Sequence, residues 1–502
     1  MTFCPSATRA PSVLPFSIAP IAVLVPGLLF LAACLYLWKL RWDLKRDRDW
    51  ELPLPPGSMG LPLVGETFHW LLQGSDFHAS RRKKYGNVFR THLLGQPVVR
   101  VTGAEHVRRL LLSEHNLVSA QWPRSTQELL GQSSLANSIG DIHRCKRKVY
   151  ARVFSHDALE SYLPRIKEVV AETRRSWIAK GGPISVYPES KRLMFRIAVS
   201  VLLGFTPTRQ EFNDLFANFE QLADNIFSLP LDVPGSGYRK VSFTLFIYFQ
   251  HFPTSHTIPT PRDRKQLKTK AQVLCIILRW IWFSGLTHVI SLLQEATVEL
   301  MFAACASSAS ASTSLILQLM KNPGALAKLR RELQANCVPD GDFLHLREIS
   351  RMHYLDCVVQ EVLRILPPVS GGYRIALQTF DLGGYQIPKG WSVLYSIRDT
   401  HDTAPIFPNP EIFNPDRFAE DQMKGKGERF QYLPFGGGVR SCLGKELAKL
   451  TIKVLAIELA STSHWELATK TCPRMLTVPV VHPDDGLKVH FQNMFTIKNV
   501  SL

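Results

Sequence analysis

One ten-residue segment constrains this 502-residue chain more than any other: Phe435-Gly436-Gly437-Gly438-Val439-Arg440-Ser441-Cys442-Leu443-Gly444. Glycines adopt positive φ easily and let the backbone approach a flat ligand closely. The helix predicted to follow, 445–460, would place its amide groups and dipole where they favour a thiolate at Cys442. Taken alone, Cys442 is most simply an ordinary buried cysteine, but the whole pattern favours a thiolate ligand in a tight loop.

Two other uses of these residue types are excluded by spacing. A dinucleotide-binding fingerprint that starts at Gly436 and Gly438 would need a third glycine where the chain has Ser441. The nine cysteines are odd in number, far apart and include no C-x-x-C pair. This spacing indicates reduced cysteines rather than a disulfide framework or a zinc site.

The segment resembles the haem-binding signature F-x-x-G-x-R-x-C-x-G of the cytochrome P450 superfamily, and it matches every fixed position. The resemblance implies that Cys442 is the catalytic thiolate and the metal ligand of haem b, which it tunes for O–O cleavage. Phe435, Arg440 and Gly444 are the other signature residues implied to lie beside the haem. The implied fold is mainly α-helical with small β-sheets (α+β).

Two upstream motifs follow the order of the same family. Glu361 and Arg364 share one face of a predicted helix, where a surface salt bridge is the ordinary interpretation. They resemble the E-x-x-R pair, and Asn414-Pro415-Asp416-Arg417-Phe418 resembles the P-E-R-F element. The resemblance implies that Arg417 completes a buried triad with that pair, because two cations on one carboxylate need a folded core.

Haem propionates need cations, and the family supplies them from positions that correspond here to Arg440, Arg374 and Arg147. A tryptophan of the family is replaced by His143, which keeps a hydrogen-bond donor. Arg147 by itself is equally well explained as a solvated cation of the basic run 144–148. The other cations of that run fit a surface that docks the acidic flavin domain of NADPH–cytochrome P450 reductase.

Wider similarity narrows the family. Several segments look like cytochrome P450 family 26, the retinoic acid hydroxylases, and most like its subfamily C. The resemblance implies oxidation of retinoic acid at ring carbon 4 by O2 and NADPH-derived electrons, giving 4-hydroxy and then 4-oxo products. The segments that carry it are Gly65-Glu66-Thr67, Ser119–Pro123, Asn225–Pro234, Pro367–Arg374 and Gly383–Arg398.

Seven residues occupy positions that line the family pocket and suit a long conjugated hydrocarbon. For each one, an ordinary place in the core is an equally good interpretation. Arg90 and Arg100 are candidates, by strand position only, to pair with the substrate carboxylate. The seven expected substrate residues are Trp122, Phe227, Phe302, Val369, Tyr373, Pro479 and Val480.

Residues 292–320 predict a buried helix rather than a membrane span, because many serines interrupt an uncharged run that follows Glu299. The resemblance places the family's acid–alcohol pair in this helix, where it delivers protons during catalysis. Here Ser307 keeps the hydroxyl, but Ala306 supplies no acid. We therefore expect a proton relay through Ser307 and water.

The amino-terminal region predicts a membrane anchor. No charged residue occurs between Arg9 and Lys39, and 18–38 is apolar enough to cross a bilayer as a helix. Cations follow this stretch, so the positive-inside rule predicts one anchor in the endoplasmic reticulum membrane with a cytosolic catalytic domain. A cleaved signal peptide is the alternative. The expected division is an anchor and basic flank at 1–50, a proline-rich linker at 51–60 and a catalytic domain at 61–502.

Residues 241–290 depart from the family pattern. They contain an apolar run, a Pro/Thr-rich stretch and a tryptophan-containing segment in place of the amphipathic helices expected over a pocket. Divergent sequence and a translated intron both explain this. This segment keeps open an inactive retinoid-binding or misfolded product as an alternative to the monooxygenase. The missing acid beside Ser307 keeps open a second alternative, an electron-independent haem-thiolate isomerase.

The formal net charge of +17 fits nucleic acid, an anionic membrane or an acidic protein. The anchor and the resemblance favour the lipid membrane and the reductase, and no nucleic acid.

Asp485-Gly486 predicts a β-hairpin. Helical periodicity predicts further helices at 142–155, 157–179, 190–204, 209–225, 322–335 and 354–366.

Overall fold

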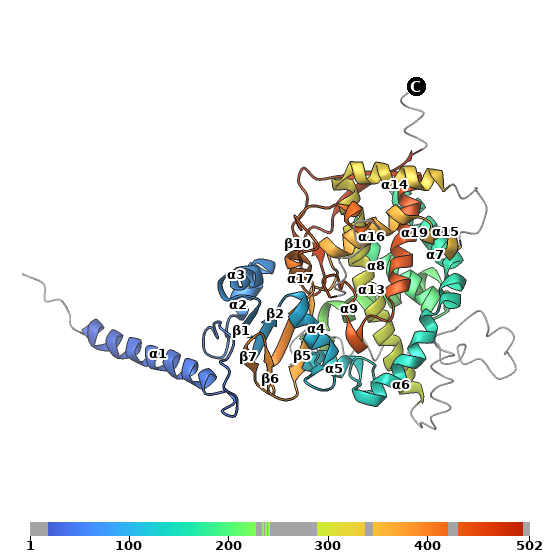
Figure 1. The fold of residues 1–502 in the computed structure, drawn as a ribbon. Coiled ribbons are helices and arrows are strands. Elements are labelled where there is room, and N and C mark those ends of the chain that lie inside the picture. The colour runs from blue at the N-terminus through green and yellow to red at the C-terminus, as the bar shows by residue number, and fades with distance from the viewer. Residues whose placement is uncertain are drawn as a thin grey trace, which may run out of the picture.

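The protein is described by a computed structural model that covers residues 19–226, 289–336, 345–419 and 430–494, with a few positions of 233–240. It is mainly helical with four small sheets among these residues (Figure 1). The longer helices are α1 (Ala19–Asp43), α2 (Thr67–Gln73), α3 (Ser75–Tyr85), α4 (Ala104–Leu112), α5 (Arg124–Leu130), α6 (Gly140–Ala151), α7 (His156–Ala179), α8 (Val186–Ile197), α9 (Arg209–Asn225), α13 (Val289–Lys321), α14 (Pro323–Ala335), α16 (His353–Ile365) and α19 (Lys445–Thr462). The strands are β1 (Val88–Leu93), β2 (Gln96–Val101), β3 (Val118–Ala120), β4 (Ile184–Ser185), β5 (Gly371–Ala376), β6 (Phe380–Leu382), β7 (Tyr385–Ile387), β8 (Ser392–Ser396), β9 (Ser463–Leu467), β10 (Met475–Leu476), β11 (His482–Pro483) and β12 (Lys488–Asn493).

The predicted helices are present, with their ends shifted by a few residues. The largest shift is in α8, which begins at Val186 and passes into a π-helical turn at Ala198–Leu202. The hairpin predicted at Asp485-Gly486 is wrong. A turn does occur there, but it joins β11 to β12, and β12 pairs with β4 and β9 instead.

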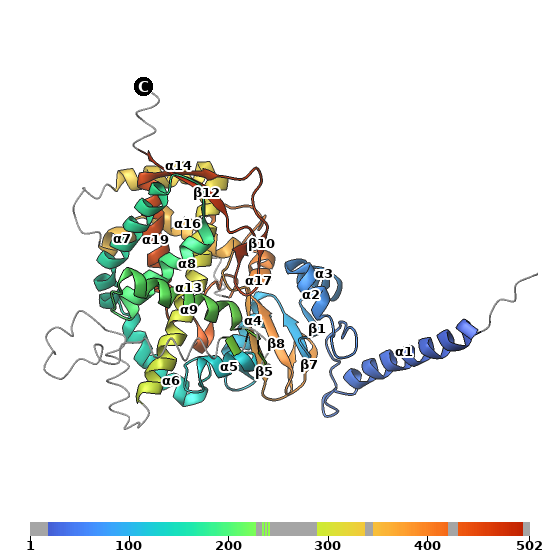
Figure 2. The same ribbon diagram turned by 180° about the vertical axis from the view of Figure 1, so that it is seen from behind.

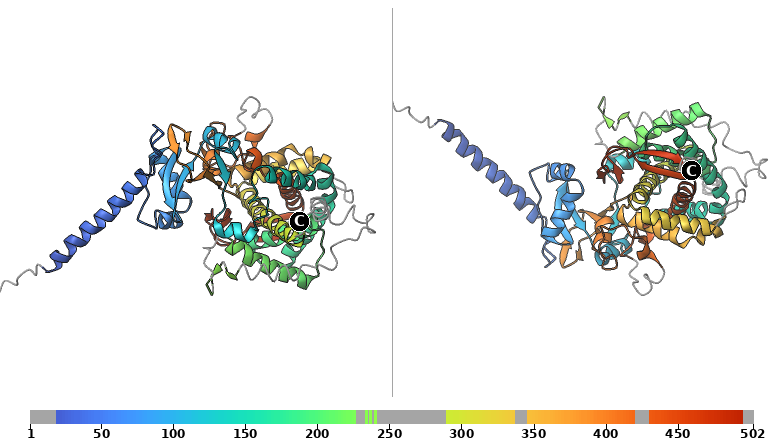
Figure 3. Two further views of the ribbon diagram at one scale, coloured as in Figure 1. Left: turned by 90° about the horizontal axis from the view of Figure 1, so that it is seen from below. Right: turned by 90° about the horizontal axis from the view of Figure 1, so that it is seen from above.

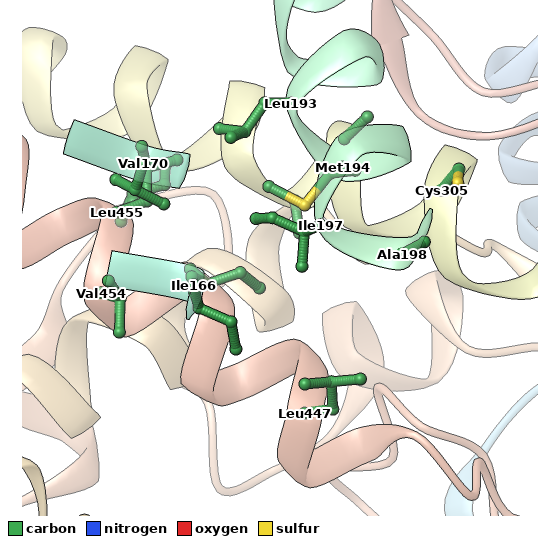
Figure 4. Close-up of a cluster of buried hydrophobic side chains, with 14 of the residues drawn as sticks. Ile166, Val170, Leu193, Met194, Ile197, Ala198, Cys305, Leu447, Val454 and Leu455 are labelled. Atoms are coloured by element: carbon green, nitrogen blue, oxygen red, sulfur yellow. The ribbon is translucent and has the colours of Figure 1, made fainter. Parts of the chain in front are cut away.

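The main core lies where α7, α8, α13 and α19 meet (Figure 4). Ile166, Leu193, Leu455 and Cys305 are among its fully buried side chains. Each apolar side chain of this size contributes roughly 1.5–3 kcal/mol when it leaves water. This core holds α13, which carries Ser307, against α19, which follows Cys442.

A five-stranded sheet in the order β1-β2-β8-β5-β3 lies beside the helices, on the side nearer α1 (Figures 1 and 2). Its central pairing, β2 with β8, is parallel and places Val99 opposite Val393. At the other edge β3 pairs with β5, so Ala120 lies opposite Arg374. The sheet therefore brings the segment before Trp122 next to a predicted propionate residue.

Helix α1 extends away from the rest of the protein (Figure 3) and exposes apolar side chains such as Phe30, which is 73% exposed. Its carboxyl-terminal end packs on the sheet, where Trp42 is buried against His92 and Trp391. The predicted linker 51–60 also contacts the sheet, since Pro56 accepts a hydrogen bond from the Arg90 amide.

Among the described side chains, one helical stretch is long and apolar enough to cross a membrane. It is Glu295–Lys321 within α13, and 67% of its most apolar window is buried inside the protein. Ser312, Thr313 and Ser314 are fully buried there. This stretch is therefore a core helix, as its serines predicted.

A buried histidine connects α16 with the segment before the cysteine loop. The amide of Leu433 donates to His401 Nε2 at 3.0 Å, so Nδ1 carries the proton and donates to the Arg364 carbonyl at 3.1 Å. Complete burial lowers the pKa of His401 from 6.5 to about 4. The imidazole is neutral and links two predicted functional segments. Sequence reasoning did not find it.

This neutral imidazole predicts a pH dependence of stability. Because its pKa is lower in the folded protein, its contribution is present above pH 6.5 and is lost as the pH falls toward 4. Between pH 7 and pH 5 this loss is on the order of 2 kcal/mol. Urea unfolding followed by tryptophan fluorescence should show a smaller pH slope for His401→Gln than for wild type. The exposed His353→Gln should keep the wild-type slope, and an unchanged slope in His401→Gln would contradict the assignment.

Candidate active site

The cysteine loop is held by one backbone hydrogen bond and by glycine conformations. The Cys442 amide donates to the Phe435 carbonyl at 2.9 Å. Gly438 has φ of 67°, and a Cβ there would lie 2.1 Å from the Leu111 carbonyl oxygen. Only glycine fits at that position, so the loop can pass close to the end of α4 and deliver Cys442 ahead of α19.

The surroundings of Cys442 act on its thiol in opposite directions. Its side chain is accessible although much protein surrounds it, and burial raises the pKa of the thiol. The Gly444 amide, Arg147 and Lys445 lower that pKa, because each stabilises the thiolate. A metal ion deprotonates a coordinated thiol outright, so these three groups suit a thiolate that ligates a cation. Phe435 is partly buried, with Lys449 Nζ 5.8 Å from its ring centre.

Arg374 and Arg440, both predicted to face propionates, meet at one buried carboxylate. Glu114 receives Arg440 Nε at 2.6 Å and lies 2.7 Å from Arg374 Nε. Its side chain is 2% exposed. Arg440 also donates to the carbonyls of Ser138 and Ala136. Sequence reasoning missed Glu114; the available signal was an acid directly after an amphipathic helix and before a short strand.

Helix α6 supplies the other two predicted propionate residues. Arg147 donates to the carbonyl and hydroxyl of Ser441, next to Cys442. His143 is buried, with its ring 5.6 Å from that of His115. Burial and the nearby Arg440 and Arg147 lower the pKa of His143 to about 4, so it is neutral at physiological pH. The structure thus places both residues beside the cysteine loop.

Not all cations of the run 144–148 face solvent, which corrects the expectation for Lys146. Its ammonium donates to the Ser133 carbonyl and the Ser138 hydroxyl, and the residue is buried. Glu299 accepts the amides of Leu135 and Ala136 from the same loop. Lys146 is buried because its ammonium group donates to oxygens of this loop. Arg144 and Lys148 remain exposed.

The triad of Glu361, Arg364 and Arg417 forms as expected. Arg364 Nε donates to one Glu361 oxygen at 2.6 Å, and Arg417 Nε donates to the other at 3.1 Å. The side chains of Glu361 and Arg364 are fully buried and that of Arg417 is 9% exposed. Arg417 also donates to three backbone carbonyls, which are those of Pro408, Asn409 and Ile412.

Several predicted substrate segments converge. The Val481 amide, directly after Val480, donates to the Pro368 carbonyl next to Val369, and Ser310 of α13 donates to the Val481 carbonyl. Phe302 is partly buried against the core on the same helix. Pro479 is exposed, and Val369 is 43% exposed.

Two of the remaining substrate residues lie close to the pairing of β3 with β5. The amide of Gln121, just before Trp122, donates to the Tyr373 carbonyl. The Tyr373 side chain packs against a small cluster that contains Phe77 and Leu394. Phe227 lies outside the described residues, as does most of 241–290.

The expected proton donor and carboxylate partners have contacts of their own. The Ser307 hydroxyl donates to the Ala303 carbonyl one turn earlier at 2.9 Å. Arg90 pairs with Asp43 at 2.8 Å, and Arg100 pairs with Asp399 at 2.9 Å. Each arginine is thus paired with an aspartate, although Arg90 Nη1 and Arg100 Nε have no hydrogen-bond partner among the described residues.

Comparison with known proteins gives the family. The cytochrome P450 family profile matches residues 55–257 and 290–491. Cytochrome P450 26B1 of Xenopus tropicalis is 56% identical over 484 residues, covering 95% of this chain and 94% of the relative. The chain belongs to cytochrome P450 family 26. The profile leaves 258–289 unmatched, which lies inside the segment that we found atypical.

The expected closeness to subfamily C is not supported. Human cytochrome P450 26B1 is 53% identical to this P450 over 484 residues, covering 95% of this chain and 94% of the relative. Human cytochrome P450 26C1 is 50% identical over 497 residues, covering 94% of each. Among solved structures, the retinoic acid bound cyanobacterial CYP120A1 has a TM-score of 0.78 at 32% identity, covering 88% of this chain and 100% of that one.

The family implies a haem-thiolate cofactor, and the residues of this P450 fit it. The groups that could hold haem are one accessible cysteine and three arginines nearby. The cysteine lies in a loop whose close approach to α4 requires a glycine at position 438. Several buried polar atoms of this site have no hydrogen-bond partner among the described residues, and a polar ligand would supply one. They include Glu114 Oε2, Arg374 Nε and both ring nitrogens of His115.

The triad predicts a large effect of burial on one ion pair. Glu361→Gln leaves two buried guanidinium groups without a counter-charge and should lower the free energy of unfolding by about 3–5 kcal/mol. Glu168→Gln is a matched control, because Glu168 also pairs with an arginine three residues away, Arg165, but on the surface. It should cost less than about 1 kcal/mol. Equal urea midpoints for the two variants would contradict the structural role of the triad.

Proposed function

We propose that this P450 is a haem-thiolate monooxygenase that hydroxylates retinoic acid at ring carbon 4 and then forms the 4-oxo product, clearing retinoic acid. Membership of family 26 supports this, as does the similarity to a P450 solved with retinoic acid bound. The observation that carries the proposal is the arrangement of Cys442 in a glycine loop beside Arg147, Arg374 and Arg440.

Haem b bound at this site would supply an oxidant made from O2 and NADPH-derived electrons. Cys442 would ligate the iron, and the Gly444 amide would stabilise the thiolate. Arg147, Arg374 and Arg440 would bind the propionates, and neutral His143 would add a hydrogen-bond donor. Charge-assisted hydrogen bonds of this type hold a planar ligand in a fixed orientation.

The substrate pocket is proposed at the convergence of α13, the segment before β5 and the segment before β11. Phe302, Val369 and Val480 offer apolar surface to a conjugated chain, and Trp122 and Tyr373 extend that surface beside β3 and β5. The other two expected lining residues are Pro479 and Phe227, which lies outside the described residues. Such a lining excludes water and orients the ring carbon toward the cysteine loop.

We propose that α1 anchors this P450 in the endoplasmic reticulum membrane, with the catalytic domain in the cytosol. Its exposed apolar side chains and the cations after Trp38 support this. A membrane location would also raise the local concentration of a lipophilic substrate. Exposed Arg144 and Lys148 on α6 fit the docking of NADPH–cytochrome P450 reductase.

Spectroscopy and turnover of the purified chain test the function together. The reduced carbon monoxide complex should show the red-shifted Soret band of a thiolate ligand, and Cys442→Ala should lack it. Retinoic acid should give 4-hydroxy and 4-oxo products only with reductase and NADPH. Turnover without reductase would favour the isomerase, and the absence of haem from the wild-type chain would favour an inactive product.

Ser307, together with water, is proposed as the proton relay of this site, because Ala306 stands where the family's pair has its acid. Ser307→Ala should lower product formed per NADPH by about tenfold or more and raise hydrogen peroxide release, because proton delivery is slowed. Ser308→Ala is the control, since the neighbouring hydroxyl points along another direction of α13. Equal coupling in the two variants, measured by product and peroxide assays, would rule out this role.

A further inference from the structure

Glu114 is a buried carboxylate in contact with two arginines of the proposed haem site and with one backbone amide. It lies between α4 and β3, and its side chain is 2% exposed. One oxygen accepts Arg440 Nε at 2.6 Å and the Ala120 amide at 2.8 Å, and the other lies 2.7 Å from Arg374 Nε. A carboxylate this deeply buried needs partners that stabilise its charge.

These contacts fix two arginines that come from distant parts of the chain. Arg440 uses Nε on Glu114 and its two terminal nitrogens on the carbonyls of Ala136 and Ser138. Arg374 lies with its guanidinium 5.2 Å from the centre of the Tyr395 ring. Glu114 therefore sets the relative position of both guanidinium groups.

The charge balance gives Glu114 a second effect. Arg147, Arg374 and Arg440 bring three positive charges to the site, and two haem propionates would neutralise two of them. Ferric iron is itself balanced by the porphyrin and the Cys442 thiolate. The remaining positive charge is matched by Glu114, and an unmatched charge in this buried place would be costly.

One part of this cluster is incompletely satisfied. Glu114 Oε2 and Arg374 Nε are at ion-pair distance, but neither has a hydrogen-bond partner with adequate geometry among the described residues. Buried polar groups are nearly always hydrogen-bonded in stable cores. Unused capacity at this point indicates that the pair is arranged to receive a further polar group.

We infer that Glu114 is a positioning residue for the haem: it orients Arg374 and Arg440 toward the propionates and balances the third guanidinium charge. The inference rests on the proposed haem site. Because Glu114 also binds the Ala120 amide, it ties the propionate cations to the segment that leads to Trp122. Glu114 thus connects cofactor binding with one wall of the proposed pocket.

Three full-length variants loaded with haem test this role. In Glu114→Gln, haem transfer to apomyoglobin should be about tenfold faster or more, in the range for outer-shell partners of metal sites. Its reduction potential should shift to a more positive value, because a negative charge is removed near a centre that gains an electron. Glu114→Asp should keep a potential near that of wild type.

Glu66→Gln is the matched control. Glu66 is also buried and pairs with an arginine, Arg81, at 2.6 Å, but it contacts none of the haem-site arginines in the described structure. It should change neither haem transfer nor potential. A Glu114→Gln protein that resembles Glu66→Gln in both measurements would overturn the inference while leaving the proposed function intact.

Two further outcomes are decisive. If Glu114→Gln fails to retain haem while Glu114→Asp retains it, the carboxylate itself is required, as inferred. If the wild-type chain takes up no haem, the proposed function fails and this inference fails with it.

Discussion

The arrangement around the active site depends on the buried carboxylate of Glu361. Its oxygens bind Arg364 on the same helix, Arg417 on a distant segment and the amide of Asn414. A buried ion pair is stable only when its donors and acceptors have hydrogen-bond partners. The packing of α16 against the segment around Arg417 therefore depends on all of these contacts forming. His401 links this part of the fold to the cysteine loop, because it bonds to the Arg364 carbonyl and to the amide of Leu433, just before the loop.

The same arrangement, a buried carboxylate between two arginines, occurs twice in the described structure. The two sites differ in how fully the carboxylate is hydrogen-bonded. Glu361 and Glu114 are both buried carboxylates that serve two arginines. Both oxygens of Glu361 are hydrogen-bonded, whereas one oxygen of Glu114 is not. Arg364 Nη1 also has no hydrogen-bond partner among the described residues, so the two clusters differ at the carboxylate itself: Glu114 has an oxygen left that can accept a further hydrogen bond.

The sequence predicted those parts of the site whose residues are close together in the chain. The cysteine loop and the pair Glu361 and Arg364 are short patterns with fixed spacing, and the structure places them as expected. The sequence did not identify Glu114 and His401 as parts of the site. Their partners lie hundreds of residues away or are backbone atoms. The acid after an amphipathic helix was a local signal for Glu114, but it did not identify its partners.

The wrong predictions share a physical cause. Lys146 was expected at the surface, and Asp485-Gly486 was expected in a hairpin. In both cases the fold supplies a competing partner: a loop carbonyl for Lys146, and β4 and β9 for the strand after the turn. Local propensity sets what a residue can do, and tertiary competition selects among the possibilities.

Two apolar helices of this chain show the same competition at larger scale. In α1 the side chains from Leu28 to Leu31 are large, apolar and exposed. In α13 small hydroxyl residues alternate with apolar ones, and Ser310 and Thr313 donate to carbonyls within the core. Small side chains let neighbouring elements approach closely, and the Ser310 hydroxyl has a partner on another segment that lipid does not offer. Length and mean hydropathy alone do not distinguish such helices, whereas the kind of residue that interrupts the apolar run does.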